Sequence, residues 1–122
     1  MLSLPLPVRI FLCTHHADMR KSFDGLAQMV RDFLGADPLS GHLFDFRSRR
    51  GDRLKLLYWD SDGLAIWYKR LEEGSFRFPP APPDGQGLEV RAADLAMLLD
   101  GVDLETVKRR KRYRRPAATS TH

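Results

Sequence analysis

The chain lacks the features that mark several large classes of protein. It has one cysteine, Cys13, so it has no internal disulfide, and no apolar run is long enough to span a bilayer. Residues 1–16 are weakly apolar, but they have no early basic region and are interrupted by Pro5 and Pro7, so we expect no signal peptide. These absences predict a reduced, cytoplasmic protein that does not bind membranes.

Recognisable catalytic and cofactor motifs are also missing. The chain has no glycine-rich phosphate loop and no nucleophile elbow. His15 and His16 are adjacent and have no second pair of ligands at the spacing typical of zinc sites. Asp60 and Asp62 lie just before a glycine, where turn formation explains them better than a metal site or an acid pair. We therefore expect no enzymatic activity, no metal and no cofactor.

The positive charge is concentrated near the C-terminus. Residues 108–115 contain seven basic residues and no acidic one, whereas the other residues include 13 basic and 16 acidic side chains. A cationic segment attached to a mildly acidic body favours a polyanion as partner, most often a nucleic acid, or an acidic protein surface. We predict one domain over residues 1–107, with a Pro/Gly-rich connection at 79–87, and a basic, disordered tail at 108–122.

Residues 53–78 carry the strongest secondary-structure signal. Side chains alternate with period two over residues 54–59 and again over 64–69, a pattern typical of strands. The connections Ser61-Asp62-Gly63 and Glu72-Glu73-Gly74 both end in glycine, as three-residue hairpin loops commonly do. The segment therefore predicts a three-stranded antiparallel meander.

The loop length determines which side chains share a face. With three-residue loops, Tyr58 lies opposite Ile66, and the core face consists of Leu54, Leu56, Tyr58, Leu64, Ile66, Tyr68, Phe76 and Phe78. The reverse face then carries Leu57, Trp59, Trp67, Lys55, Lys69 and Arg77. A slip of one residue exchanges these assignments, and two-residue loops would mix the faces.

The flanking segments complete an α+β domain. Further strands are expected at 8–14, 42–47 and 88–90, with Phe46 opposite Leu54 across a five-residue loop at 48–52. An apolar stripe of helical period predicts a helix that Asp18 caps and Gly35 ends, and a second helix is expected at 92–100. The predicted fold is an antiparallel β-meander of four to five strands, packed against an N-terminal amphipathic helix and a short C-terminal helix.

Three basic regions are candidate binding sites. They are the tip of the hairpin at 48–52, which we call the hairpin tip, the reverse face of the sheet and the tail. Their predicted nucleic-acid-binding residues are Arg47, Arg49, Arg50, Arg53, Lys55, Lys69, Arg77, Lys108, Arg109, Arg110, Lys111, Arg112, Arg114 and Arg115. On the reverse face, Trp59 and Trp67 are predicted to stack on unpaired bases or to bind a partner. Two alternatives remain open: the tryptophans pack under a helix as a second core, and the hairpin tip is an ordinary solvated turn.

Three long motifs resemble one known family. They read MRKSFDGL at 19–26, PLSGHLF at 38–44 and RRGDRLKLLYWDSDGLAIWYKRLEEGSFRFP at 49–79. Over residues 8–103 the chain resembles the small accessory protein encoded by the second open reading frame of bacterial insertion sequences of the sixty-six type, often labelled TnpB. The resemblance implies a role in transposition, alongside a separate transposase that carries the strand-transfer chemistry and another small accessory protein. It supplies no catalytic residues.

Two functional hypotheses follow. In the first, the chain is a non-catalytic accessory protein that binds DNA non-specifically through the basic hairpin and tail. In the second, it is a protein-interaction adaptor that recruits or stabilises the transposase without contacting DNA. A small hydrolase is a third and more distant hypothesis.

Overall fold

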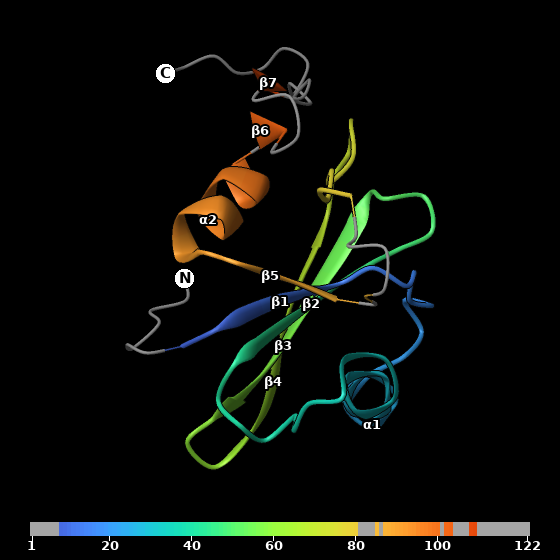
Figure 1. Cartoon of the computed structure of the whole chain (residues 1–122). Helices are drawn as coiled ribbons and strands as arrows, with labels where there is room; N and C mark the ends of the chain where they lie inside the picture. The colour runs from blue at the N-terminus through green and yellow to red at the C-terminus, as the bar shows by residue number, and fades with distance from the viewer. Residues whose placement is uncertain (1–7, 81–84, 86, 101, 104–107, 110–122) are drawn as a thin grey trace, which may run out of the picture.

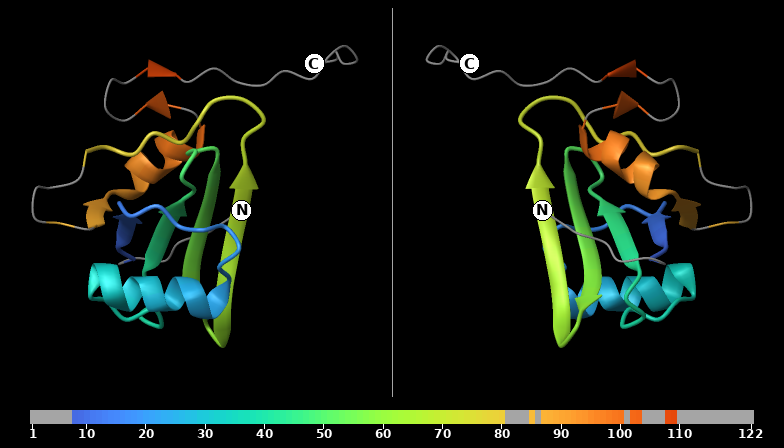
Figure 2. Two further views of the ribbon diagram at one scale, coloured as in Figure 1. Left: turned by 90° about the vertical axis from the view of Figure 1, so that its right-hand side faces the viewer. Right: turned by 90° about the vertical axis from the view of Figure 1, so that its left-hand side faces the viewer.

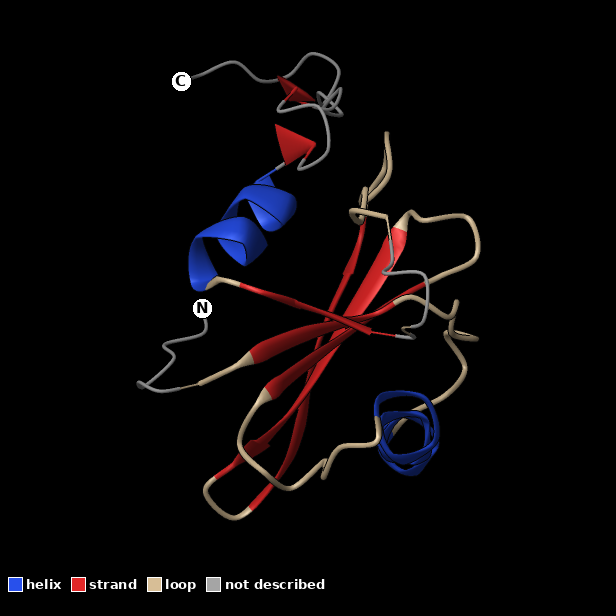
Figure 3. Cartoon of the chain, in the orientation of Figure 1, coloured by secondary structure: helices blue, strands red, loops and turns tan. Residues whose placement is uncertain are grey.

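A five-stranded sheet with helices on both faces forms the body of the molecule (Figures 1 and 3). The computed structural model describes residues 8–80, 85, 87–100, 102–103 and 108–109. The sheet has the order β4-β3-β2-β1-β5, and its strands are β1 (Ile10–Cys13), β2 (Leu43–Arg47), β3 (Arg53–Asp60), β4 (Gly63–Arg70) and β5 (Gly87–Val90). The remaining elements are α1 (Phe23–Met29), the π-helix η1 (Val30–Leu34), α2 (Ala92–Asp100) and a backbone pairing of β6 (Val102–Asp103) with β7 (Lys108–Arg109).

The α+β class and the five strands agree with the sequence prediction, but the sheet is not a pure meander. Strands β1 and β2 run parallel, whereas every other neighbouring pair in the sheet is antiparallel. The reason is the connection through α1 and η1, since a helical crossover returns the chain in the same direction. β1 thereby lies inside the sheet, between β2 and β5.

The hairpin between β3 and β4 is closed by two residues rather than three. Asp60 pairs with Gly63, so Tyr58 lies opposite Ala65, and Leu56 lies opposite Trp67. Ser61, the first of the two turn residues, has a positive φ of 56°, and the Asp62 N–H donates to the carbonyl of Asp60 across it. The prediction of a three-residue loop is therefore wrong, because serine adopts the conformation that was expected of glycine.

The hairpin between β2 and β3 is also shifted by one residue from its predicted register. Arg47, rather than Phe46, lies opposite Leu54, and Phe46 lies opposite Lys55. The backbone N–H of Ser48 donates to the carbonyl of Arg53 (3.0 Å), which extends the pairing into the expected loop. Both shifts change which side chains share a face of the sheet.

The two faces of the sheet carry separate hydrophobic clusters. One face joins the sheet to Leu95 and Leu98 of α2, and its buried members are Ile10, Leu12, Leu43, Leu54, Leu56, Phe76, Phe78, Leu95 and Leu98. The other face joins it to α1 and η1, and its buried members are Cys13, Ala17, Leu26, Ala27, Met29, Val30, Phe44, Phe46 and Leu57. We call these the α2 face and the α1 face.

The predicted core face is correct only in part. Leu54, Leu56, Phe76 and Phe78 are buried together on the α2 face, with Tyr58 packed beside them. Leu64 and Ile66 instead pack against the α1 face, and Tyr68 is 47% exposed. The cause is the two-residue turn, because it moves every side chain of β4 to the opposite face.

The third strand of the predicted meander does not form. Residues 71–80, which we call the covering segment, are irregular and cross over the α2 face. Two main-chain hydrogen bonds of 2.7 Å fix this segment to the hairpin tip: Leu71 N–H donates to the carbonyl of Asp52, and Phe76 N–H donates to that of Gly51. The segment therefore buries Phe76 and Phe78 without adding a strand.

The helices begin and end where local capping permits. α1 begins four residues later than predicted, after Ser22, because the Asp18 carboxylate accepts the Arg20 backbone N–H (2.9 Å) and closes a turn. Gly35 follows η1 with φ 58° and ends the helical segment, as predicted. No helix within the described ranges is long and apolar enough to cross a membrane.

Candidate nucleic-acid interface

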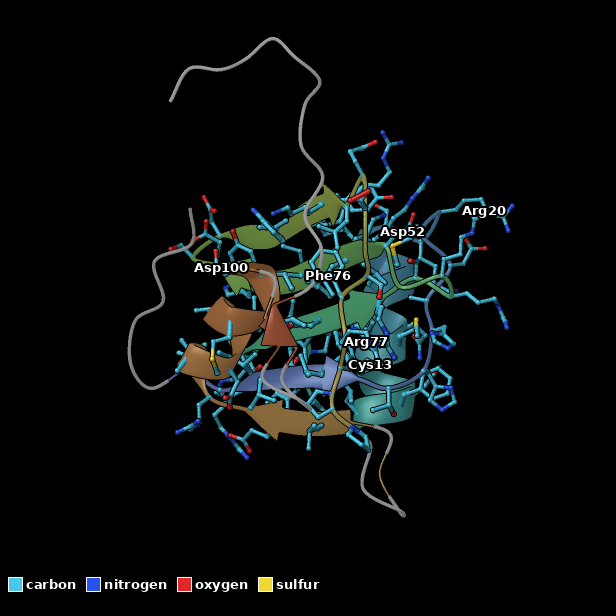
Figure 4. All side chains as sticks on the ribbon, turned by 90° about the horizontal axis from the view of Figure 1, so that it is seen from above. Cys13, Arg20, Asp52, Phe76, Arg77 and Asp100 are labelled. Atoms are coloured by element: carbon cyan, nitrogen blue, oxygen red, sulfur yellow. The ribbon has the colours of Figure 1, made fainter. Side chains whose placement is uncertain are left out.

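The topology brings several arginines to one end of the sheet. β2 ends at Arg47, β3 begins at Arg53 and β4 ends at Arg70, so the antiparallel pairing places all three at the same end. Figure 4 shows Asp52 and Arg20 at this end and Asp100 at the opposite one. The hairpin tip therefore projects from an end of the sheet that is already rich in cations.

Five cations at this end have side chains open to solvent, and we call them the basic end: Arg49, Arg50, Arg53, Lys69 and Arg77. Arg53 is half-buried and the other four are exposed. The hydrogen bonds between the covering segment and the hairpin tip bring Arg77 close to the tip. Within the described part of the chain, none of the five forms an ion pair. Their charges are available to an anionic partner.

Arg47 belongs to the predicted set but is turned into the protein. Its Nη1 donates to the carbonyl of Phe76 (3.2 Å), and its guanidinium lies 4.4 Å from the centroid of the Phe78 ring. Burial lowers the pKa of Arg47, and the nearby charge of Arg77 lowers it further. Arg47 therefore anchors the covering segment on the sheet.

Lys55 is buried as well, which corrects its predicted place on an exposed face. Its Nζ donates to the carbonyls of Met19 (2.8 Å) and Lys21 (2.7 Å) and lies 4.7 Å from the centroid of the Tyr68 ring. The residue is only 7% exposed. Lys55 thus ties the segment before α1 to the sheet, and its ammonium group already donates to two main-chain carbonyls.

The predicted stacking face of interleaved cations and tryptophans is divided between the two sides of the sheet. Trp59 shares the α1 face with Lys55, whereas Trp67 and Lys69 lie on the α2 face. Both tryptophans are half-buried, and Trp67 packs against the cluster that contains Leu54 and Leu56. The two indoles therefore do not form one platform.

The basic tail lies mostly outside the described residues. Lys108 and Arg109 form β7, for which the backbone pairing with β6 is described. The remaining predicted tail residues, Arg110, Lys111, Arg112, Arg114 and Arg115, are outside the described ranges, and their role stays a prediction.

Asp45 is a buried carboxyl that sequence reasoning did not find. It is 0% exposed, and among the described residues neither carboxylate oxygen has a hydrogen-bond partner. Burial raises the pKa of Asp45 well above its ordinary value. The signal that could have indicated the burial of Asp45 was the apolar pair Phe76 and Phe78, because these residues must cover one face of the sheet.

Across the described ranges, no three His, Cys, Asp or Glu residues are grouped as a metal site.

Comparison with known proteins places the chain among proteins of mobile elements. A family model described as "IS66 Orf2 like protein" matches residues 8–109. The uncharacterised protein y4jC of Sinorhizobium fredii is 40% identical over 109 residues, which are 89% of this chain and 91% of that protein. A second uncharacterised protein of this bacterium, y4hO, is 41% identical over 96 residues, or 79% of this chain and 82% of that protein. No solved structure matches the chain.

Proposed function

Because this chain belongs to the IS66 Orf2-like family, whose members are transposition-related accessory proteins, we propose that it supports transposition of a bacterial insertion sequence by binding DNA non-specifically. The observation that carries the proposal is the basic end, where Arg49, Arg50 and Arg77 are exposed and form no ion pair within the described residues. The basic tail, residues 108–115, supplies a second set of positive charges.

The positions of these arginines suit a phosphate backbone. Arg49 and Arg50 lie on a turn that projects from the sheet. Their side chains can therefore contact a large, extended ligand such as a DNA duplex. Contacts of this kind neutralise phosphates and release counterions, and they carry no sequence information. The protein would hold DNA by its backbone while the separate transposase performs strand transfer.

Binding to a short DNA duplex, measured by fluorescence anisotropy over a series of salt concentrations, tests the proposal. We expect the affinity of the full chain to fall steeply with salt. Replacing Arg49, Arg50 and Arg77 with alanine should weaken binding at low salt and flatten the logarithmic salt slope by about 0.9 for each phosphate that is no longer neutralised. A chain that ends at Val107 should also have a flatter slope.

Arg91→Ala is a matched control. Arg91 is an exposed arginine that pairs with Asp94 (3.2 Å), and it precedes α2, outside the basic end. Its replacement should leave the salt slope unchanged. If the unmodified chain does not bind DNA at low salt, or if the control variant and the triple variant lose binding equally, the proposed interface is wrong.

A second candidate function is that of an adaptor that recruits or stabilises the transposase without contacting DNA. The observation that favours it is apolar surface on the sheet, where Trp59 and Trp67 are half-buried and Tyr68 is 47% exposed. Co-purification with the transposase separates the two functions. The adaptor function requires that Trp67→Ala abolish capture of the transposase while DNA retention is unaffected.

A further inference from the structure

Within the described part of the chain, the outer edge of β4 is open along its whole length. β4 is the first strand in the sheet order, and it pairs with β3 from Arg53↔Arg70 to Asp60↔Gly63 without a bulge (Figure 2). It has eight residues and no proline, and its only cations, Lys69 and Arg70, are its last two residues. The opposite edge strand, β5, has only four residues. Long, unprotected edges are uncommon in proteins that stay monomeric, because they offer main-chain donors and acceptors to another strand.

The turn determines which residues of β4 face this open edge. Asp60 and Gly63 close a two-residue hairpin, and such a closing pair exchanges both main-chain hydrogen bonds. Hydrogen-bonded pairs alternate along an antiparallel ladder, so Ala65, Trp67 and Lys69 also bond to β3. The intervening residues Leu64, Ile66, Tyr68 and Arg70 therefore direct their N–H and C=O groups outward.

We propose that a second copy of this chain pairs with this edge, antiparallel and about a two-fold axis at Ile66, so that one sheet continues through both copies. In this register Leu64 of each copy lies opposite Tyr68 of the other, and Arg70, the last residue of β4, lies beside Asp62 in the turn of the other copy. The residues between them pair a small side chain, Ala65, with a large one, Trp67. Pairing about a two-fold axis makes every such contact occur twice.

Charge and hydrogen-bond direction select this register. Outward-facing residues must meet outward-facing residues, so the strands can shift only in steps that keep this match. A two-fold axis at Trp67 would set apolar Leu64 opposite Arg70, and an axis at Ala65 would leave Lys69 and Arg70 beyond the end of the partner strand. The axis at Ile66 keeps Lys69 opposite Gly63 of the partner strand and brings Arg70, which also pairs with Glu72 of its own copy, beside the turn residue Asp62 of the other copy. Opposite charges therefore meet at both ends of the paired strands.

Exposed aromatic surface beside the edge fits the same partner. Tyr68 is 47% exposed, and Phe23, which begins α1, is 44% exposed. Tyr68 lies on the α1 face, and α1 contacts β4 there. A strand laid along the edge would bring Leu64 of the second copy against Tyr68, so the pairing removes apolar surface from water as well as satisfying main-chain groups.

Sedimentation velocity of the full chain, over a range of protein concentrations, measures the association. We expect a monomer–dimer equilibrium that Ile66→Pro shifts to monomer, because proline removes the outward N–H of residue 66 and leaves the bonds to β3 in place. Circular dichroism of this variant establishes whether it is folded.

Charge reversal gives a second test that does not depend on proline. Arg70→Glu and Asp62→Arg should each weaken the dimer roughly tenfold, because each sets like charges opposite one another, and the double variant should restore it. Arg91→Glu, which lies outside this edge, is the control and should not change the association.

A chain that is monomeric at every concentration overturns the proposal. So does a dimer that keeps its affinity in folded Ile66→Pro, since the association would then use another surface. If Ile66→Pro is unfolded, the charge pair decides: rescue by the double variant supports the register, and failure of rescue overturns it.

Discussion

Arg53 and Arg70 lie directly opposite each other on β3 and β4, with both side chains on the α1 face. Like charges in this position repel. The structure offsets the repulsion in part: Arg53 Nη1 donates to Tyr68 Oη (3.4 Å), and Arg70 pairs with Glu72 (3.1 Å). Glu72 therefore reduces the positive charge next to the basic end.

Removing this compensating carboxylate should strengthen DNA binding. We expect Glu72→Gln to raise the affinity for duplex DNA and to steepen its salt dependence, because Arg70 gains the freedom to contact phosphate. The free energy of unfolding should change little, since Arg70 and Glu72 form an exposed pair. Anisotropy titrations at several salt concentrations measure the effect, and an unchanged or flatter slope would contradict it.

Lys55 should matter for folding and not for DNA. Lys55→Met keeps the apolar stem but removes both hydrogen bonds to the carbonyls of Met19 and Lys21. We expect a loss of about 2 kcal/mol in the free energy of unfolding, which is typical of hydrogen bonds from a charged group. Denaturant titration measures the loss. DNA affinity measured under folding conditions should equal that of the unmodified chain, and a large fall would return Lys55 to the interface.

Replacing Ser61 with glycine should stabilise the protein. It holds φ 56° at the first central position of the turn, where a side chain is disfavoured and glycine is not. Ser61→Gly should stabilise the protein by about 0.5 to 1 kcal/mol, because the steric cost of a left-handed backbone exceeds the extra entropy that glycine gives the unfolded chain, and thermal unfolding should shift upward by a few degrees. Ser75→Gly in the covering segment is the comparison, because Ser75 does not have a positive φ. A lower melting temperature for Ser61→Gly would mean that the positive φ of Ser61 does not destabilise the fold.

Asp45 should make stability depend on pH. Because folding raises the pKa of this buried carboxyl, the folded state binds the proton more tightly than the unfolded chain. The contribution of Asp45 to stability is therefore greatest below the ordinary carboxyl pKa of about 4, and this contribution falls as the pH rises from there through the raised pKa.

Replacing Asp45 with asparagine tests this dependence. Asp45→Asn removes the ionisation, so the variant should be more stable than the unmodified protein at pH 7, by about 1 to 3 kcal/mol, and this advantage should disappear in acid. Denaturant titrations at several pH values provide the comparison. Asp60→Asn, a change of an exposed aspartate, is the control and should not give this pH-dependent advantage. An equal advantage at every pH would mean that ionisation of Asp45 is not the cause.

The elements of the fold could be predicted from the sequence better than their register. The helix at 92–100 has the predicted bounds, and Gly35 ends the first helical segment as expected. The prediction of the register failed because the sequence Ser61-Asp62-Gly63 fits both a three-residue loop and a two-residue turn followed by a strand. A serine in the left-handed conformation decides between them, and no local pattern indicates it. The parallel pairing of β1 and β2 depends on contacts distant in sequence.

The candidate site was predictable where side chains lie on a turn. Arg49 and Arg50 are exposed as expected, because their side chains project from the tip of a hairpin. Arg47 and Lys55 are not exposed as the alternation predicts, since the direction of their side chains depends on which segment crosses the sheet. Arg47 donates to the carbonyl of residue 76 and packs on the ring of residue 78, and Lys55 donates to the carbonyls of residues 19 and 21. Neither contact can be read from alternation along a strand.

The position of β1 also bears on synthesis of the protein. This strand leaves the ribosome long before one of its neighbours, β5, which ends at residue 90. While the intervening residues are translated, an almost wholly buried strand, IFLC, has one edge without its native partner. The nascent chain therefore passes through a stage in which this apolar strand exposes unpaired main-chain groups, and chaperone contact during translation should concentrate on this strand.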